Sequence, residues 1–134
     1  MESGSCHCGK VVFEINGSLS DVNYCYCETC RKLSGGAYSV VTRVSSDKFN
    51  VIRGNELLHT YESSPGKERY YCNVCCSPIY VTVKSQPEFV RIRLGVLDFE
   101  PKVNIVGHIW VSEKPKWYSI NDLLPQYQEW PTNA

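Results

Sequence analysis

The sequence lacks a surplus of charge of either sign. Its 134 residues include 14 Lys and Arg and 14 Asp and Glu, which gives a formal net charge of zero. A protein that binds the phosphate backbone of nucleic acids needs surplus cations, and a polybasic membrane anchor needs them too. The balanced charge therefore argues against nucleic-acid binding and against attachment to a membrane surface.

The sequence also lacks long hydrophobic runs. Its purely aliphatic runs extend over only a few residues, whereas a membrane-spanning helix needs about 20 apolar residues. The first residues, MESGS, are polar and predict no signal peptide. We therefore expect no membrane segment. We expect the protein to be located in a reducing compartment such as the cytoplasm, and the sequence does not argue against the nucleus.

Repeats, low-complexity tracts and linkers are absent as well. Hydrophobic residues make up 43% of the chain and charged residues 21%, which is typical of a globular protein and not of a disordered one. The length fits one domain with one hydrophobic core. We therefore expect residues 1–134 to form a single domain.

Most of the sequence has the pattern of short β-strands. Val11, Phe13 and Ile15 alternate with their neighbours on a period of two residues. Further strands are expected at residues 37–43, 49–53, 57–61, 79–83, 89–96 and 103–111. Short helices are expected at residues 28–33 and 119–124, the second ended by Pro125. The pattern predicts a mostly β fold of the sandwich or barrel-like class.

Cysteine, in contrast, is abundant, with 8 residues in 134. In a reducing compartment, grouped cysteines are more often metal ligands or redox groups than disulfides. The cysteines form a C-x-C, a C-x-C-x-x-C and a C-x-x-C-C group: Cys6 and Cys8; Cys25, Cys27 and Cys30; Cys72, Cys75 and Cys76. Thiolates are among the best protein ligands for zinc, which prefers four of them in a tetrahedron. The grouping therefore predicts zinc binding.

Counting ligands divides the cysteines between two zinc ions. The two outer groups supply a closed structural site of Cys6, Cys8, Cys72 and Cys75. The middle group supplies Cys25, Cys27 and Cys30. Three protein ligands leave one position of a tetrahedral zinc open, which is typical of a catalytic site.

Two alternatives to this division stay open. Cys76 can close the second site, and both zinc ions would then be structural. We expect Cys76 instead to adopt a left-handed turn and to point away, at a cost of about 1 kcal/mol of backbone strain. The other alternative is an oxidised scaffold in which the cysteines pair as disulfides.

The order of these motifs resembles the glutathione-dependent formaldehyde-activating enzyme family, whose domain is also called the centromere-protein-V type. The resemblance is carried by C-x-C-G from Cys6, C-x-C-x-x-C-R-K from Cys25 and R-x-x-C-x-x-C-x-S-P from Arg69. It extends over nearly the whole chain through Gly35-Gly36, Tyr61-Glu62-Ser63-Ser64, Gly95-Val96-Leu97-Asp98, His108-Ile109-Trp110 and Leu124-Pro125. The sequence departs from the family pattern at Tyr26, where the family often has His, and at Cys76, where it usually has Gly.

The resemblance implies a mostly β fold of several short antiparallel sheets stapled by zinc, with one or two short helices, shared with certain nucleotide-exchange accessory proteins. It implies a structural zinc on Cys6, Cys8, Cys72 and Cys75 and a catalytic zinc on Cys25, Cys27 and Cys30. The implied activity is that of a carbon–sulfur lyase, which reversibly combines formaldehyde with glutathione to give S-hydroxymethylglutathione. The implied partners are a small thiol such as glutathione and a small aldehyde.

Candidate substrate-binding residues follow from the chemistry of such a thiol. Glutathione carries two carboxylates, which predicts cations near the open zinc. Arg31 and Lys32, directly after the third ligand, are the first candidates, and Arg69 is a second choice. His108 is a candidate proton shuttle, although a lone His in a strand is more often a hydrogen-bonded part of the scaffold.

Two other functions compete with the lyase. A zinc-stabilised interaction module without a reaction would be favoured if Cys76 closed the second zinc site. A redox enzyme similar to the methionine sulfoxide reductases would use Cys76 as its reactive thiol. That family usually builds its zinc site from two C-x-x-C motifs, whereas the first cysteine motif of this chain is C-x-C. We therefore favour the lyase, and the sequence leaves the oligomeric state open.

Overall fold

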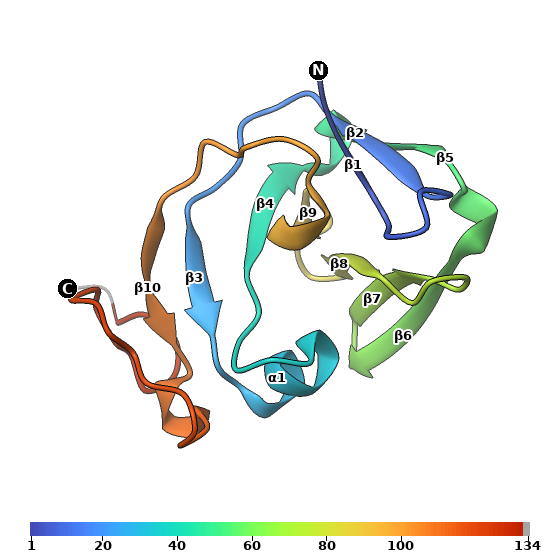
Figure 1. The fold of residues 1–134 in the computed structure, drawn as a ribbon. Helices are drawn as coiled ribbons and strands as arrows, with labels where there is room; N and C mark the ends of the chain where they lie inside the picture. The colour runs from blue at the N-terminus through green and yellow to red at the C-terminus, as the bar shows by residue number, and fades with distance from the viewer. Residues whose placement is uncertain (133–134) are drawn as a thin grey trace. The chain divides into compact units, whose positions relative to one another are not determined.

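The computed structural model describes residues 1–132, which fall into two compact units. The first unit comprises Met1–Ser20 and Thr42–Lys102. The second comprises Asp21–Val41 and, among the described residues, 103–132. Strands predominate in the described chain (Figure 1), which confirms the predicted mostly β class. The organisation as a single domain stays a prediction.

The first unit contains a three-stranded antiparallel sheet with the strand order β1-β2-β5. Its strands are β1 (Glu2–Ser5), β2 (Val12–Ile15) and β5 (Phe49–Arg53). Phe13 of β2 pairs with Gly4 of β1. A Cβ atom on Gly4 would lie 2.2 Å from the ring of Phe13, so this close pairing requires glycine.

A five-stranded sheet with the order β4-β9-β8-β7-β6 accounts for most of the rest of this unit. Its strands are β4 (Val41–Ser45), β6 (Leu58–Ser64), β7 (Lys67–Cys72), β8 (Pro78–Val83) and β9 (Phe89–Arg93). The strands from β6 to β9 pair antiparallel with their neighbours. Short 3-10 turns lie at Ser46–Lys48, Asn55–Leu57 and Leu94–Val96.

Side chains from both sheets form the core of the first unit. Phe13 and Ile15 of β2 belong to the same buried cluster as Val90 and Ile92 of β9. Phe49 of β5 packs on Phe13, with 5.3 Å between the ring centroids. Each fully buried side chain of this size stabilises the fold by about 1.5–3 kcal/mol. The period-two pattern seen in the sequence therefore marks the residues that hold the two sheets together.

The second unit is built on a two-stranded sheet and one helix. Its elements are β3 (Val22–Cys25), α1 (Glu28–Ser34), β10 (Ile105–Ile109) and a 3-10 turn at Val111–Glu113. Helix α1 ends at Gly35, whose φ of 76° allows its N–H to donate to the carbonyl of Arg31. The helix predicted at residues 28–33 is therefore confirmed.

Strand β10 pairs with β3 in parallel. One expectation for this unit is wrong. The helix predicted at residues 119–124 is absent. The carboxylate of Asp122 accepts the N–H of Leu124 at 2.9 Å, and Pro125 follows at once. Such a local side-chain bond competes with the helical hydrogen bonds, so this stretch forms irregular structure.

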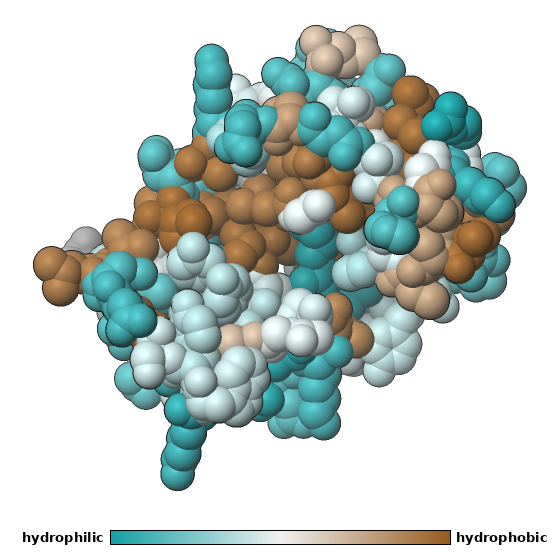
Figure 2. Space-filling model, viewed as in Figure 1, coloured by the Kyte–Doolittle hydropathy of each residue, from teal (hydrophilic) through white to brown (hydrophobic). Residues whose placement is uncertain are grey.

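The described helices are all short, and none is long and apolar enough to cross a membrane. The face drawn in Figure 2 carries both hydrophobic and hydrophilic residues. Large exposed hydrophobic side chains include Ile52, Trp117 and Leu123. Single exposed apolar residues of this kind are common on proteins and need no special explanation.

Candidate metal centres

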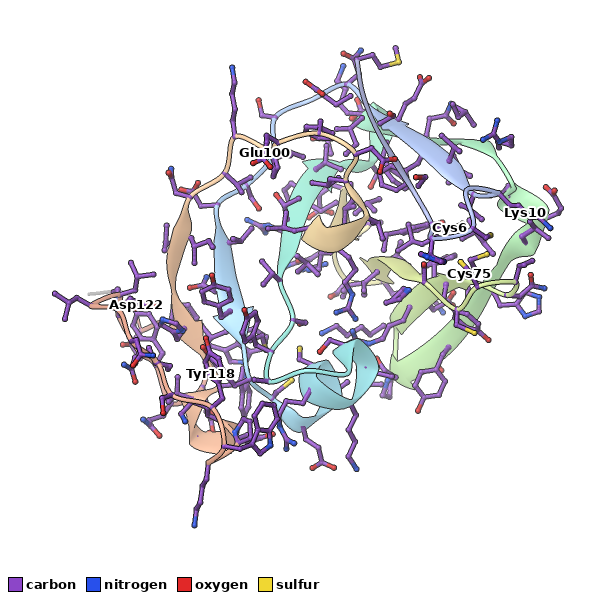
Figure 3. The ribbon with its side chains drawn as sticks, in the orientation of Figure 1. Cys6, Lys10, Cys75, Glu100, Tyr118 and Asp122 are labelled. Atoms are coloured by element: carbon purple, nitrogen blue, oxygen red, sulfur yellow. The ribbon has the colours of Figure 1, made fainter. Side chains whose placement is uncertain are left out.

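Four cysteines meet in the first unit where two turns come together. Cys6 and Cys8 follow β1, while Cys72 ends β7 and Cys75 lies in the turn to β8. Their sulfur atoms all lie within 4.8 Å of one another. Figure 3 shows Cys6 and Cys75 beside each other. The structure therefore brings together the residues predicted to form the closed site.

The spacing of these sulfur atoms fits a tetrahedral zinc ion. Sulfur atoms at about 2.3 Å from a tetrahedral zinc are about 3.8 Å apart. The Sγ atom of Cys8 lies 3.5 Å from that of Cys6 and 3.9 Å from that of Cys72. These two separations match the one that the ion requires, and the remaining sulfur–sulfur distances are within 4.8 Å.

The surroundings of this cluster favour the thiolate form at Cys75 but not at Cys8, where a backbone hydrogen bond with Lys10 lowers the pKa but burial and the neighbouring thiols raise it to about 11. The N–H of Val11 donates to Cys6 Sγ at 3.3 Å, and the N–H of Val74 donates to Cys72 Sγ at 3.4 Å. Burial works against ionisation of Cys75, but hydrogen bonds with Ser77 outweigh it and lower the pKa of Cys75 to about 5. Hydrogen bonds to the charged form stabilise it, so these contacts suit metal ligands.

Cys76 belongs to neither cysteine cluster. It is exposed and has a φ of 66°, which confirms the left-handed turn expected at this residue. Its N–H donates to the carbonyl of Cys72 at 2.8 Å, so the turn serves to close the loop around the cluster. No disulfide joins any of the eight cysteines, all of which lie within the described residues.

The second cluster consists of three cysteines at the junction of β3 and α1. Cys25 ends β3, Cys27 caps the helix and Cys30 lies within it. Their sulfur atoms all lie within 4.8 Å of one another. The Sγ atom of Cys27 accepts the N–H of Cys30 at 3.3 Å, which fixes one cysteine against the other. The backbone of Cys25 exchanges two hydrogen bonds of 3.0 Å with Ser39.

The three thiols of this cluster oppose one another's ionisation. Hydrogen bonds with Cys27 and then Cys30 raise the pKa of Cys25, and burial raises it further. Three close thiolates need a balancing cation, and a divalent metal ion supplies one. An ion held by three protein ligands keeps one tetrahedral position for another molecule. The cluster can therefore hold a metal ion in an open site.

A chain of hydrogen bonds leads from between the cysteines of this cluster to the surface of the second unit. The hydroxyl of Tyr26 lies 2.7 Å from His108 Nδ1, and His108 Nε2 lies 2.9 Å from the carboxylate of Asp122. The carboxylate can only accept, so we assign the ring proton to Nε2 and the Tyr26 hydroxyl as the donor to Nδ1. Tyr26 and His108 are buried, whereas the Asp122 side chain is 42% exposed.

Burial and these hydrogen bonds shift the pKa of Tyr26 and that of Asp122. Burial raises the pKa of Tyr26, so the phenol stays protonated. The hydrogen bond with His108 lowers the pKa of Asp122. His108 therefore serves as a hydrogen-bonded support of Tyr26, which lies between two cysteines of the cluster. The sequence offered no signal for this series of hydrogen bonds, because they join residues that are 82 and 14 positions apart.

The cations predicted to bind substrate lie in different surroundings. Lys32 on α1 forms an exposed ion pair with Glu28 at 3.1 Å. The Nε atom of Arg31 is buried and has no hydrogen-bond partner among the described residues. Arg69 lies on β7, where its Nε donates to Ser63 Oγ at 2.8 Å. Helix α1 thus carries Arg31 and Lys32 together with Cys30.

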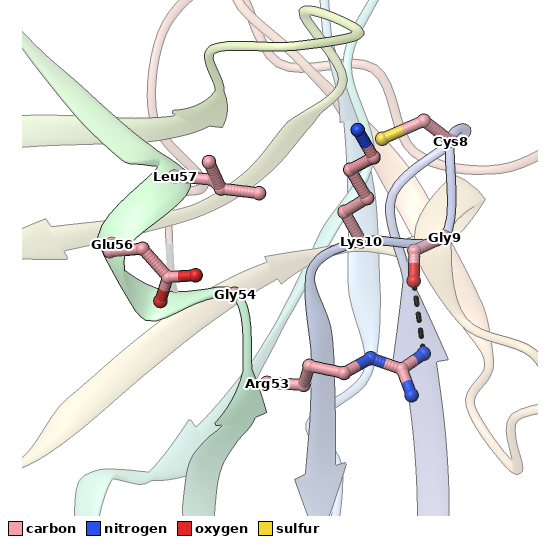
Figure 4. Close-up of a pocket in the computed structure, with 7 residues that line it drawn as sticks. All are labelled: Cys8, Gly9, Lys10, Arg53, Gly54, Glu56 and Leu57. Carbon is pink, nitrogen blue, oxygen red and sulfur yellow. Dashed lines mark hydrogen bonds between the residues drawn. The ribbon is translucent and has the colours of Figure 1, made fainter.

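A cavity of about 410 Å³ borders the four-cysteine cluster (Figure 4). It is lined by Cys8, Gly9, Lys10, Arg53, Gly54, Glu56 and Leu57. The guanidinium of Arg53 donates to the carbonyl of Gly9 at 3.1 Å and so holds the turn that follows Cys8. The lining includes no residue of the three-cysteine cluster, so this cavity does not serve the open site.

Comparison with known proteins gives consistent matches. The model of a family described as "Glutathione-dependent formaldehyde-activating enzyme" matches residues 1–113. A protein of Halomonas elongata, provisionally named for the same activity, is 32% identical over 125 residues, which cover 87% of this chain and 79% of the relative. A protein of Pyrenophora teres f. teres with the same provisional name is 32% identical over 72 residues, or 52% of this chain and 38% of that one.

A solved structure is also similar. The crystal structure of a Rhodobacter sphaeroides protein matches with a TM-score of 0.65 and 22% sequence identity. The match covers 79% of this chain and 98% of that chain. At this level of identity the likeness shows a shared fold and nothing about function.

Proposed function

The chain belongs to the glutathione-dependent formaldehyde-activating enzyme family, and from that premise we propose that it is a zinc-dependent carbon–sulfur lyase. Its substrates would be a small thiol such as glutathione and a small aldehyde such as formaldehyde. The proposal includes two zinc ions for each chain, a structural ion on the four-cysteine cluster and a catalytic ion on the three-cysteine cluster.

The observation that carries the proposal is the difference between the two clusters. The first offers four sulfur ligands and can close a tetrahedral site, whereas the second offers only three. Cys76, the residue whose sulfur would be needed to close the second site, belongs to neither cluster and is exposed. An open site supports a reaction, while two closed sites would support a purely structural role.

The proposed reaction balances without an oxidant or reductant. The thiol loses its proton, its sulfur forms a bond to the aldehyde carbon, and the carbonyl oxygen gains a proton to become a hydroxyl. The reverse reaction breaks the same carbon–sulfur bond. Zinc bound to Cys25, Cys27 and Cys30 would supply the positive charge that favours a thiolate over a thiol at its open position.

The protein's own residues would position this chemistry. Cys27 is held by the N–H of Cys30, and Cys25 by its paired hydrogen bonds with Ser39. Tyr26 is fixed between them by His108. Held reactants can gain several kcal/mol from proximity alone, which is where we expect most of the rate acceleration to arise.

We propose that the carboxylates of the thiol contact Arg31 and Lys32 on α1. The Nε atom of Arg31 is buried without a partner, so a carboxylate would satisfy it. The ion pair of Lys32 with Glu28 is exposed and contributes little, so Lys32 can exchange Glu28 for a substrate carboxylate.

The test is the rate of exchange between glutathione and S-hydroxymethylglutathione, measured by NMR in the presence of formaldehyde. We expect the zinc-loaded wild type to accelerate exchange and the Cys27→Ser variant to leave only the uncatalysed rate. Cys76→Ser is the matched control, because it removes a thiol that belongs to neither cluster. It should keep the wild-type rate.

Each other outcome has a definite meaning. If neither the wild type nor Cys76→Ser accelerates exchange, the lyase proposal is wrong and a zinc-stabilised interaction module becomes the better description. If Cys76→Ser loses activity while Cys27→Ser keeps it, the reactive thiol is Cys76 and a redox function gains support.

A further inference from the structure

The cavity beside the four-cysteine cluster is bordered by two turns that are fixed against each other. Gly54 is buried, and a Cβ atom there would lie 2.2 Å from the carbonyl oxygen of Lys10, so the backbones of the two turns are in contact. The guanidinium of Arg53 donates to the carbonyl of Gly9 at 3.1 Å and joins the same turns a second time. The backbone of these two joined turns therefore holds the shape of the cavity.

Three charged side chains line this cavity: Lys10, Arg53 and Glu56. None of the three forms an ion pair with a residue in the described range 1–132. The ammonium group of Lys10 supplies three donors, and Arg53 keeps N–H groups beyond the one that it donates to Gly9. The carboxylate of Glu56 can only accept hydrogen bonds. The cavity thus offers charges of both signs to a molecule that enters it.

The side chains of Lys10 and Glu56 lie on opposite walls of the cavity (Figure 4). Glu56 and Leu57 are neighbours in the 3-10 turn at Asn55–Leu57, and Leu57 packs partly against the core. The wall that carries the carboxylate therefore also carries an apolar surface. The volume of about 410 Å³ is within the range of about 300–1,000 Å³ that is typical of sites for small molecules.

We propose that this cavity binds a free α-amino acid with an apolar side chain. Its carboxylate contacts Lys10 and Arg53, and its ammonium group contacts Glu56. The ammonium group and the side chain of an amino acid are attached to the same carbon, so the adjacent Glu56 and Leu57 can receive both. A simple carboxylate or a phosphate fits less well, because it would leave Glu56 without a partner.

This site is separate from the proposed reaction. Its lining includes Cys8 of the four-cysteine cluster and no residue of the three-cysteine cluster. A bound amino acid would connect the turn after Cys8 to the 3-10 turn that contains Glu56. A ligand that binds only the folded state stabilises that state, so the amino acid would stabilise this part of the first unit.

The probe is L-leucine, titrated into the zinc-loaded full chain while two-dimensional NMR spectra record the backbone amides. Two analogues are the matched ligand controls: leucinamide lacks the carboxylate, and isocaproate lacks the amino group. We expect L-leucine to shift the amide signals of Gly9, Lys10 and Glu56. Each analogue should bind about tenfold more weakly, because it lacks one charged contact.

Lys10→Gln and Glu56→Gln test the two walls. Each should weaken the binding of L-leucine by about threefold, because ion pairs at exposed positions are weak. Lys102→Gln and Glu100→Gln are the matched controls, since they make the same changes at exposed positions of the first unit outside the cavity lining. They should leave the affinity unchanged.

The effect of each variant should also depend on the group that the ligand carries. Glu56→Gln should not weaken the binding of isocaproate, which has no ammonium group, and Lys10→Gln should not weaken that of leucinamide. Arg53 is left unchanged in this test because it also holds the turn at Gly9.

An amino acid can also bind a metal ion, so Cys27→Ser serves to test for binding at the three-cysteine cluster. We expect this variant to bind L-leucine as the wild type does. The proposal is overturned if L-leucine does not bind, or if Cys27→Ser abolishes binding while Lys10→Gln and Glu56→Gln keep it. It is also overturned if both analogues bind as tightly as L-leucine, or if the control variants lose as much affinity as the cavity variants. No reaction is measured, so these results do not depend on the lyase activity.

Discussion

At the scale of single residues, Asp122 controls how the buried His108 is held. Its carboxylate contacts His108 Nε2 at 2.9 Å, and this bond lowers the pKa of Asp122. A carboxyl group with a lowered pKa in the folded state stabilises the fold fully above its unfolded pKa of about 3.9. The stabilisation is then lost as the pH falls through the lower, folded-state pKa.

We therefore expect Asp122→Asn to lower the thermal unfolding midpoint at pH 7. The difference from the wild type should shrink as the pH falls below about 4. Circular dichroism melts between pH 7 and pH 3 measure this, with Asp47→Asn as a control at another exposed position. A difference that stays constant over the whole range would show that the charge of Asp122 contributes nothing.

At the scale of elements, Gly54 joins β5 to the following 3-10 turn where its backbone passes close to the backbone of Lys10. Its φ is 82°, and a Cβ atom there would lie 2.2 Å from the carbonyl oxygen of Lys10. We expect Gly54→Ala to lower the free energy of unfolding by about 2 kcal/mol or more, since both the backbone conformation and the contact are unfavourable. Chemical denaturation measures the change.

Gly95→Ala is the control for that measurement. Gly95 has no atom within 4 Å of the added Cβ atom and does not need a positive φ. Its replacement should change stability by only a few tenths of a kcal/mol in either direction. Equal losses in the two variants would mean that the close approach at Gly54 is not what constrains the turn.

The elements that the sequence predicted are those with a strong local signal. The strand at Phe49–Arg53 was predicted with its observed bounds, because aromatic and β-branched residues favour strands. Strands β1, with the sequence ESGS, and β7, with KERYYC, were missed. Neither has a clear hydrophobic alternation, and both form through pairing with neighbours, which local sequence does not encode.

The features of the candidate site also divide into those that the sequence predicted and those that it did not. The spacing of the cysteines predicted which residues would meet, since metal ligands must come in geometrically feasible pairs. The chain from Tyr26 through His108 to Asp122 was not predicted, and Asp122 was placed in a helix that does not exist.

At the scale of the whole molecule, the two clusters differ in how much chain each one closes. The first joins Cys8 to Cys72 across 64 residues, whereas the second spans only Cys25 to Cys30. By the entropy of loop closure, a metal ion that cross-linked each cluster would contribute about 4 kcal/mol for the long loop and about 2 kcal/mol for the short one. Because metal binding adds to folding free energy, an ion on the first cluster should matter more for stability than one on the second.

We expect native mass spectrometry to find two zinc ions on the wild type and one each on Cys8→Ser and Cys27→Ser. Cys8→Ser should also lower the unfolding midpoint more than Cys27→Ser, because it releases the longer loop. Both substitutions exchange a sulfur for an oxygen, so they differ mainly in which cluster they affect. If Cys27→Ser keeps both ions, or if the two variants unfold at the same temperature, the division into a structural and an open site is wrong.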